Sequence, residues 1–185
     1  PGRGVVGVSE FWFKYVQLEQ KPYPTSFIDG TRSPETLTIP TEGVLNPQEG
    51  TVECWVCPLR TPGTNYQTIF DARYQVSIDG NNKGLVGGIA PNGKLFFIVG
   101  QGASYSAISS TTTITKDTWY SVAFRWSSSG SAIIVNGAVE ATGPAPSGLQ
   151  LNSSLYLGSS GGIQEYLDGL IDDLRISSIA RSDEE

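Results

Sequence analysis

Short runs of apolar or alternating residues, separated by turn residues, follow one another along most of the chain. Many of the runs alternate apolar and polar side chains with the two-residue period of a β-strand. No stretch shows a sustained helical period of apolar positions. The runs are ETLTIP, TVECWVCPL, QTIFDA, YQVSID, GLVGGIA, KLFFIVG, SAISST, WYSVAFRW, SAIIVNGAVEAT, SLYLGSS and YLDGLIDDLRIS. Their spacing predicts an all-β fold, a sandwich of two antiparallel sheets.

Two Asn-Gly pairs mark the turns of two expected hairpins. Asn92-Gly93 and Asn136-Gly137 each lie between strand-like runs. This dipeptide accepts the left-handed backbone that a two-residue hairpin loop requires. We therefore expect hairpins over residues 85–99 and 131–142.

The last run, LDGLIDDLRISS at 167–178, carries a carboxylate that interrupts its apolar face. If Leu170, Leu174 and Ile176 face the core, strand geometry places Asp172 on the same face. An unpaired carboxylate in an apolar layer is costly. We expect Asp172 either to accept backbone N–H groups from a neighbouring loop or to bind a cation, and the residues alone leave both alternatives open.

Composition and charge exclude several classes of protein. The chain has 185 residues with 18 acidic and 12 basic side chains, a net charge of −6, so we expect one domain and no nucleic-acid partner. No apolar stretch approaches the roughly 20 residues of a membrane-spanning helix. The chain has no histidine, which removes the commonest general base and metal ligand. We expect no catalysis and no membrane insertion.

The two cysteines, in VECWVC, are expected to remain unbonded to each other. Cys54 shares its strand face with Val52 and Val56, whereas Cys57 falls on the opposite face. A disulfide or a zinc site needs the two thiols to converge. We therefore expect one core thiol and one outward thiol.

Seven segments, in this order, resemble the laminin G-like or concanavalin A-like jelly-roll domains of bacterial and phage proteins. The resemblance runs from about residue 35 to the end of the chain. It implies a jelly roll over 31–185, in which Trp55 and Trp119 occupy scaffold positions. The segments are GTVECWVCP, YQTIFDA, NGKLFFIVG, TWYSVAFRW, IIVNGAVEATG, LYLGSSGG and YLDGLIDDLRISSIARSDEE.

Residues 9–29, SEFWFKYVQLEQKPYPTSFID, resemble the end of a carbohydrate-binding-type β-sandwich module that precedes such jelly rolls. We therefore interpret residues 1–30 as an N-terminal strand and a Pro-containing linker. The strand has three alternative roles: it joins an edge of this sandwich, pairs between protomers of a homo-oligomer, or is a remnant of the preceding module.

The family resemblance favours calcium as the partner of Asp172. Such jelly rolls bind a structural Ca²⁺ through the Asp of the last strand and groups in the segment that enters the domain. In this chain the implied co-ligands are Asp29, Gly30 and Glu35. Carboxylate and carbonyl oxygens are the ligands that Ca²⁺ prefers.

Candidate ligand-binding residues are the aromatic side chains outside the core pattern. In TWYSVAFRW one face of the strand holds Tyr120, Val122, Phe124 and Trp126, which we assign to the core. Three tyrosines lie instead beside loop segments, where β-sandwiches carry their binding residues. These candidates are Tyr66, Tyr105 and Tyr166, each with the alternative of an ordinary solvated loop residue.

These observations favour a non-catalytic domain that binds a glycan or cell-surface polysaccharide, within a larger phage tail or bacterial surface protein. We expect an extracellular, cell-surface or virion-tail location, although residues 1–13 show no secretion signal. The alternative is a structural or oligomerisation spacer. A glycoside hydrolase comes third, because related glucanases alternate their carboxylates along one strand, and Glu53, Asp71, Glu140 and Glu165 do not.

Overall fold

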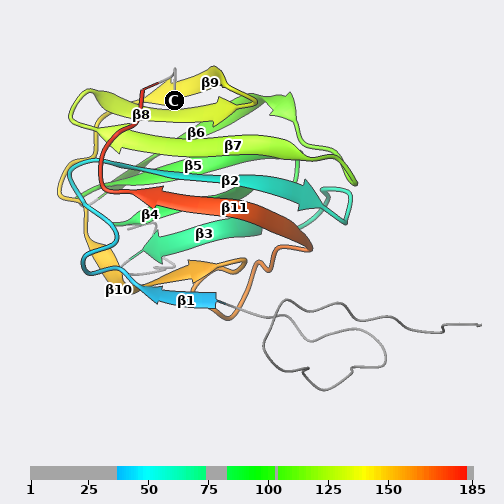
Figure 1. Ribbon diagram of the computed structural model, residues 1–185, viewed down its shortest axis with the longest axis horizontal. Helices are drawn as coiled ribbons and strands as arrows, with labels where there is room; N and C mark the ends of the chain where they lie inside the picture. Colours follow the sequence, from blue (N-terminus) through cyan, green and yellow to red (C-terminus); the bar gives the residue numbers. More distant parts are fainter. Residues whose placement is uncertain (1–36, 74–82, 103, 183–185) are drawn as a thin grey trace, which may run out of the picture. The chain divides into compact units, whose positions relative to one another are not determined.

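Two antiparallel β-sheets pack face to face in the computed structural model, which describes residues 37–73, 83–102 and 104–182 (Figure 1). One sheet has the strand order β1-β10-β3-β4-β5-β6, and the other β11-β2-β7-β8-β9. The strands are β1 (Leu37–Pro40), β2 (Gly50–Pro58), β3 (Gln67–Arg73), β4 (Leu85–Ile89), β5 (Lys94–Gln101), β6 (Ser104–Thr113), β7 (Tyr120–Ser127), β8 (Gly130–Val135), β9 (Ala138–Gly143), β10 (Leu151–Leu157) and β11 (Gly169–Ser177). The predicted sandwich is confirmed.

Ten of the eleven predicted runs form these strands, and SAIIVNGAVEAT supplies the two strands of a hairpin, β8 and β9. The run YQVSID and the expected strand and linker at 1–30 lie outside the described residues. The described part contains no helix that is long and apolar enough to cross a membrane.

The two hairpins form where they were expected, but with different turns. At Asn136-Gly137 both φ angles are positive, 50° and 79°, and Val135 pairs with Ala138, so this loop has two residues as predicted. At the other hairpin the N–H of Ala90 donates to the carbonyl of Lys94 at 2.8 Å, which leaves a three-residue loop at 91–93. The two-residue prediction was wrong there, because it requires an N–H at Pro91 to close the loop.

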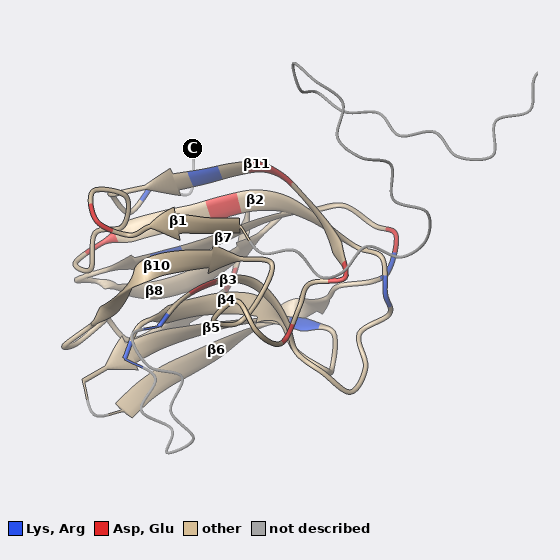
Figure 2. Ribbon diagram, turned by 90° about the horizontal axis from the view of Figure 1, so that it is seen from below, with Lys and Arg blue, Asp and Glu red and all other residues tan. Residues whose placement is uncertain are grey.

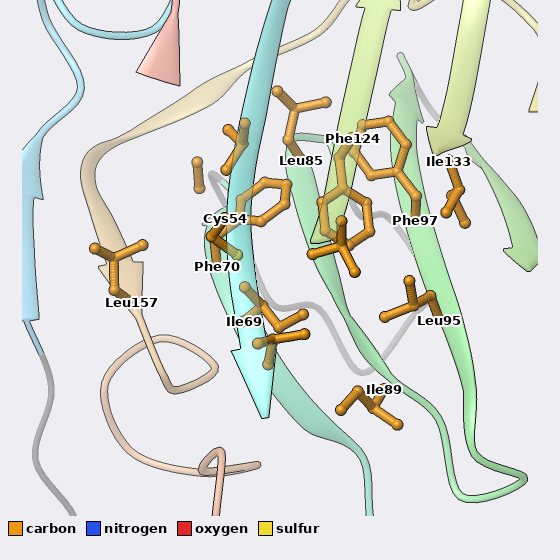
Figure 3. Close-up of a cluster of buried hydrophobic side chains, with 14 of the residues drawn as sticks. Cys54, Ile69, Phe70, Leu85, Ile89, Leu95, Phe97, Phe124, Ile133 and Leu157 are labelled. Carbon is orange, nitrogen blue, oxygen red and sulfur yellow. The ribbon is translucent and has the colours of Figure 1, made fainter. Parts of the chain in front are cut away.

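The core lies between the sheets and is built around three phenylalanine rings (Figure 3). Phe124 of β7 packs against Phe70 of β3 and Phe97 of β5, with ring centroids 5.3 and 5.5 Å apart. The stripe of alternate residues on β7 that ends in Trp126 is buried as predicted. The indole N–H of Trp126 donates to the carbonyl of Asn46 at 3.0 Å, so its polar atom is satisfied inside the core.

One margin of the sandwich, where β6 and β9 are the edge strands, is joined by the Glu140 carboxylate. One oxygen of this carboxylate accepts the backbone N–H groups of Thr111 and Thr112 at 2.9 and 2.8 Å, and the other accepts the Thr112 hydroxyl. Partial burial opposes the charge, but these hydrogen bonds prevail and hold the pKa of Glu140 below its ordinary value. Glu140 therefore links the two sheets as a carboxylate.

A β-bulge in β11 changes which of its residues face the core. Asp172 pairs with Trp55 of β2, and Arg175 pairs with Glu53, so two residues of β11 lie opposite the single residue Cys54. Asp173 adopts the left-handed backbone of a bulge, with φ of 48°.

This bulge contradicts the expected burial of Asp172. On its N-terminal side Ile171 packs against the core, and on its C-terminal side Leu174 and Ile176 do so. Asp172 and Leu170 are exposed. The prediction assumed an unbroken two-residue period, which the extra residue Asp173 interrupts.

Candidate functional site

The outer face of the five-stranded sheet, the face that points away from the core, carries a hollow of about 230 Å³. Figure 2 shows a basic segment of β11 beside an acidic segment of β2. Strands β2, β7, β8 and β11 and the segment that follows β11 all contribute to the hollow. Its lining includes Glu53, Trp55, Ser121, Arg125, Ile134 and Arg175.

Trp55 is the exposed aromatic residue of this hollow. Val52, Cys54 and Val56 face the core, so the alternation of β2 turns Trp55 outward. Its side chain is 44% exposed. A large aromatic surface that stays accessible beside polar groups is typical of a binding site.

A second exposed tryptophan is Trp119. Trp119 directly precedes β7, and the pairing of Tyr120 with Val56 places it level with Cys57. Trp55 is paired with Ser121, two residues further along β7. If the register of β7 is continued by one residue, Trp119 takes a position diagonal to Trp55. The prediction that the two are scaffold residues was wrong, since they are 44% and 43% exposed.

The charged groups of the hollow are arranged around a loose ion pair. Nη1 of Arg175 and Oε1 of Glu53 lie 3.7 Å apart, and the Arg175 side chain is 68% exposed. An exposed pair at this distance contributes little to stability. Arg175 therefore presents most of its guanidinium group to solvent beside the tryptophan.

The segment that follows β11 forms one wall of the hollow. The hydroxyl of Thr51 donates to the carbonyl of Ile179 at 3.1 Å and accepts the N–H of Arg181 at 3.0 Å. Arg125 donates from Nη1 to the carbonyl of Arg181 at 2.8 Å. These hydrogen bonds hold residues 179–181 against β2 and β7.

The four carboxylates considered for glycosidase chemistry lie on four different elements. Only Glu53 belongs to the hollow. Asp71 is held in a buried ion pair on β3, Glu140 joins two edge strands, and Glu165 accepts the hydroxyl of Thr68 at 3.5 Å. The described structure does not bring them together as an acid and a nucleophile.

Both cysteines are free thiols, as predicted. Cys54 belongs to the core. Burial, together with the neighbouring Glu53 carboxylate, raises the pKa of the Cys54 thiol to about 12, so it stays protonated and unreactive at neutral pH. Cys57 lies outside the core cluster, which agrees with its predicted outward direction, but it is buried as well.

The three candidate tyrosines do not form one site. Tyr66 packs its ring edge-on against Phe96, with ring centroids 5.2 Å apart, near the start of β5. Tyr105 on β6 pairs with Gly100, at the end of β5. Tyr166 donates its hydroxyl to the carbonyl of Gly162 at 3.3 Å. Their role in ligand binding stays a prediction.

Asp172 is the one member of the expected calcium set that the structure describes, since Asp29, Gly30 and Glu35 lie outside the described residues. Its Oδ1 accepts the N–H of Asp173 at 2.8 Å. Within the described ranges, no three His, Cys, Asp or Glu side chains form a group that could hold a metal ion. The burial argument for the site is lost, and calcium binding stays a prediction supported by the family resemblance.

Sequence reasoning missed Trp55, Arg125 and Arg175 as a group. The alternation of β2 already places Trp55 and Glu53 on the face opposite Cys54. Alternation also turns Arg175 outward, since its neighbours Leu174 and Ile176 face the core. Alternation does not show that β11 lies beside β2.

The model of a laminin G-like family, described as the concanavalin A-like lectin/glucanases superfamily, matches residues 29–185. A comparison with curated protein sequences gave no match.

Several solved structures share the fold. One is the receptor-binding domain of the botulinum neurotoxin C/D mosaic serotype, with a TM-score of 0.62 and 18% identity over 80% of this chain and 38% of that one. Another is the botulinum neurotoxin serotype D binding domain, with a TM-score of 0.61 and 19% identity over 82% and 39%. A third belongs to a study of botulinum neurotoxin type C, whose cell entry depends on two ganglioside molecules; its TM-score is 0.58, with 15% identity over 80% and 37%.

Proposed function

Because the chain belongs to the concanavalin A-like lectin/glucanases superfamily, we propose that it is a non-catalytic glycan-binding domain that acts at an extracellular surface. Its binding site is the outer face of the five-stranded sheet. The domain forms part of a larger phage tail or bacterial surface protein, and its partner is a glycan or a cell-surface polysaccharide.

The observation that carries this proposal is the exposed indole of Trp55 in a hollow with polar walls. The apolar face of a sugar ring packs on such an indole, and its hydroxyl groups need donors and acceptors at the rim. Arg175 offers donors, Glu53 offers an acceptor, and Ser121 offers both. The second indole, at Trp119, extends the apolar surface diagonally, which suits a ligand of more than one sugar unit.

Two further observations support the proposal. Glycoside hydrolysis needs two carboxylates close together, whereas Glu53, Asp71, Glu140 and Glu165 lie on four different elements. This arrangement favours binding without hydrolysis. Solved structures of the same fold are named as receptor-binding domains, and one belongs to a study of ganglioside-dependent cell entry. Those structures are less than 20% identical to this chain, so they support the fold directly and the function by analogy.

A glycan array followed by titration calorimetry tests the proposal. The variant Trp55→Ala should lower the affinity for the best array glycan at least tenfold, about 1.4 kcal/mol. The matched control is Tyr105→Ala, which removes another side chain that is 44% exposed but lies on the six-stranded sheet; its affinity should stay within twofold.

Both variants should keep the wild-type melting temperature within about 2 °C, because each change is at an exposed side chain. Unchanged binding by Trp55→Ala would place the site elsewhere, and loss in the Tyr105 variant would favour the predicted loop residues. If no glycan on the array binds, glycan recognition is refuted, and sedimentation analysis of the wild type then tests the oligomerisation alternative.

A further inference from the structure

We propose that the glycan recognised at the outer face is acidic, and that Arg175 binds its anionic substituent. This inference rests on the proposed function and deepens it, since it names the class of sugar. The anionic group is a carboxylate or a sulfate. Each of them offers a pair of oxygen atoms that can accept two N–H groups of one guanidinium group.

The first support is the distribution of charge. Among the described residues, three arginines line the hollow, Arg125, Arg175 and Arg181, together with the acidic residues Glu53 and Asp173, and the exposed Asp172 pairs with Trp55 beside them. The whole chain, by contrast, has a net charge of −6. A group of three arginines on one face of an acidic protein attracts an anionic ligand to that face.

The second support is the state of Arg175. Its nitrogen lies 3.7 Å from the Glu53 oxygen, beyond the 2.7–3.2 Å of a normal N–H···O hydrogen bond. The side chain is 68% exposed, so a ligand can reach the guanidinium without displacing a strong partner. Its donors lie in a fixed plane and can bind a carboxylate through two parallel hydrogen bonds.

The third support is the position of Arg175 relative to the indole. Arg175 pairs with Glu53, two residues before Trp55 on β2. Residues in this diagonal relationship lie about 7–8 Å apart, within reach of long side chains. A sugar ring that stacks on Trp55 can therefore direct a substituent to the guanidinium group of Arg175.

The bulge of β11 adds a further outward side chain, that of Asp172, to this face. With the extra residue Asp173, both Asp172 and Arg175 point outward although three positions separate them. In a strand without the bulge, residues three apart would face opposite sides of the sheet. The positions of Leu174 and Ile176 in the core turn Arg175 outward by ordinary alternation, and the bulge turns Asp172 outward as well, which is a common use of bulges.

The test compares acidic glycans with their neutral parents. Wild-type protein and the variants Arg175→Gln, Glu53→Gln and Arg60→Gln are applied to an array that carries sialylated, uronate-containing and sulfated glycans, each beside its uncharged parent. The best acidic glycan and its parent are then titrated calorimetrically at two salt concentrations. Arg60 is exposed and does not line the hollow, so its variant is the control for the loss of one positive charge.

We expect the wild type to bind the acidic member of a pair at least tenfold more tightly than the neutral one, with an affinity that falls as salt increases. Arg175→Gln should abolish that difference, because it should weaken binding of the acidic glycan at least tenfold more than it weakens binding of the neutral parent. Glu53→Gln should strengthen binding of the acidic glycan, because it removes a like charge. Arg60→Gln should change neither affinity by more than twofold.

The inference is overturned if the wild type binds neutral parents equally well, or if Arg175→Gln retains the preference for acidic glycans. In both cases the Trp55-dependent glycan binding of the proposed function still stands. Absence of binding to every glycan overturns the proposed function, and this inference with it.

Discussion

Asp71 and Arg73, two residues apart on β3, form a buried bidentate ion pair. Nη2 of Arg73 lies 2.7 Å from Oδ2 of Asp71, and Nε donates to Oδ1 at 2.9 Å. Nη2 also donates to the hydroxyl of Ser160 at 2.6 Å, and the N–H of Gly161 donates to Oδ2 of Asp71 at 3.1 Å. The pair therefore fastens the segment after β10 to the six-stranded sheet.

The variant Asp71→Asn should lose about 3–5 kcal/mol of unfolding free energy, because it leaves the Arg73 charge buried without its counter-ion. Urea unfolding at pH 7 measures the loss. The exposed residue Glu42 provides the control, and Glu42→Gln should change stability by less than about 0.5 kcal/mol. The double variant Asp71→Leu, Arg73→Met should recover much of the loss, since it removes both charges. A single variant as stable as wild type would mean that the pair carries no such role.

Glu140 predicts a loss of stability in acid. Its pKa is lowered in the folded protein, so its contribution is fully present above the ordinary carboxyl pKa and is lost as the pH falls through the lowered value. The variant Glu140→Gln should be less stable than wild type at pH 7, and the difference should shrink as the pH falls below the ordinary glutamate pKa of about 4.3 and through the lowered value. Urea unfolding of both proteins across this range measures it. A difference that does not depend on pH would assign the effect to packing instead of the carboxylate charge.

Calcium binding can be tested without knowledge of the full ligand set. If Asp172 holds Ca²⁺ together with Asp29, Gly30 and Glu35, calcium should raise the melting temperature of chelator-treated protein in a concentration-dependent way. The stabilisation reaches roughly 2.7 kcal/mol at a hundredfold excess over the dissociation constant. Asp172→Asn should abolish the response. Identical melting curves with calcium and with chelator would refute the site and leave the sandwich intact.

Alternation along the strands was enough to predict the two-sheet class and the core face of β7, because both depend on local side-chain direction and burial. The same rule, applied without a bulge, misplaced Asp172. The sequence offers a clue to the bulge: if Asp173 is omitted, Ile171, Leu174 and Ile176 fall on one face and Asp172 and Arg175 on the other. A buried carboxylate is costly. A break in the two-residue alternation, which leaves Asp172 exposed, was therefore a better interpretation of this strand than a buried Asp172.

The binding face was harder to predict, because it is assembled from residues far apart in the chain. Trp55, Arg125 and Arg175 are brought together by the strand order β11-β2-β7. Alternation gives the face of each side chain but does not give the neighbour of each strand. The wall formed by residues 179–181 depends on hydrogen bonds to Thr51 and Arg125. These residues are far apart in the chain, so the alternation of side chains within one strand does not predict the hydrogen bonds.

The bulge itself gives the last prediction. Asp173 has a φ of 48°, a left-handed conformation that β-branched residues adopt only with strain. Asp173→Val should therefore destabilise the protein by about 1–2 kcal/mol, whereas Asp173→Gly should be neutral or stabilising, because glycine adopts this conformation without a steric cost.

Asp172 is the matched control for this prediction. It is the preceding residue, is also exposed, and does not have a positive φ. In chelator-treated protein, Asp172→Val should lose only an exposed hydrogen bond to the N–H of Asp173 and so change the stability by less than about 0.5 kcal/mol. Urea unfolding of the three variants measures the order of stability, in which Asp173→Val should be the lowest. If Asp173→Val is as stable as Asp172→Val, the left-handed residue is not at 173. The outward direction of Asp172 would then need another explanation.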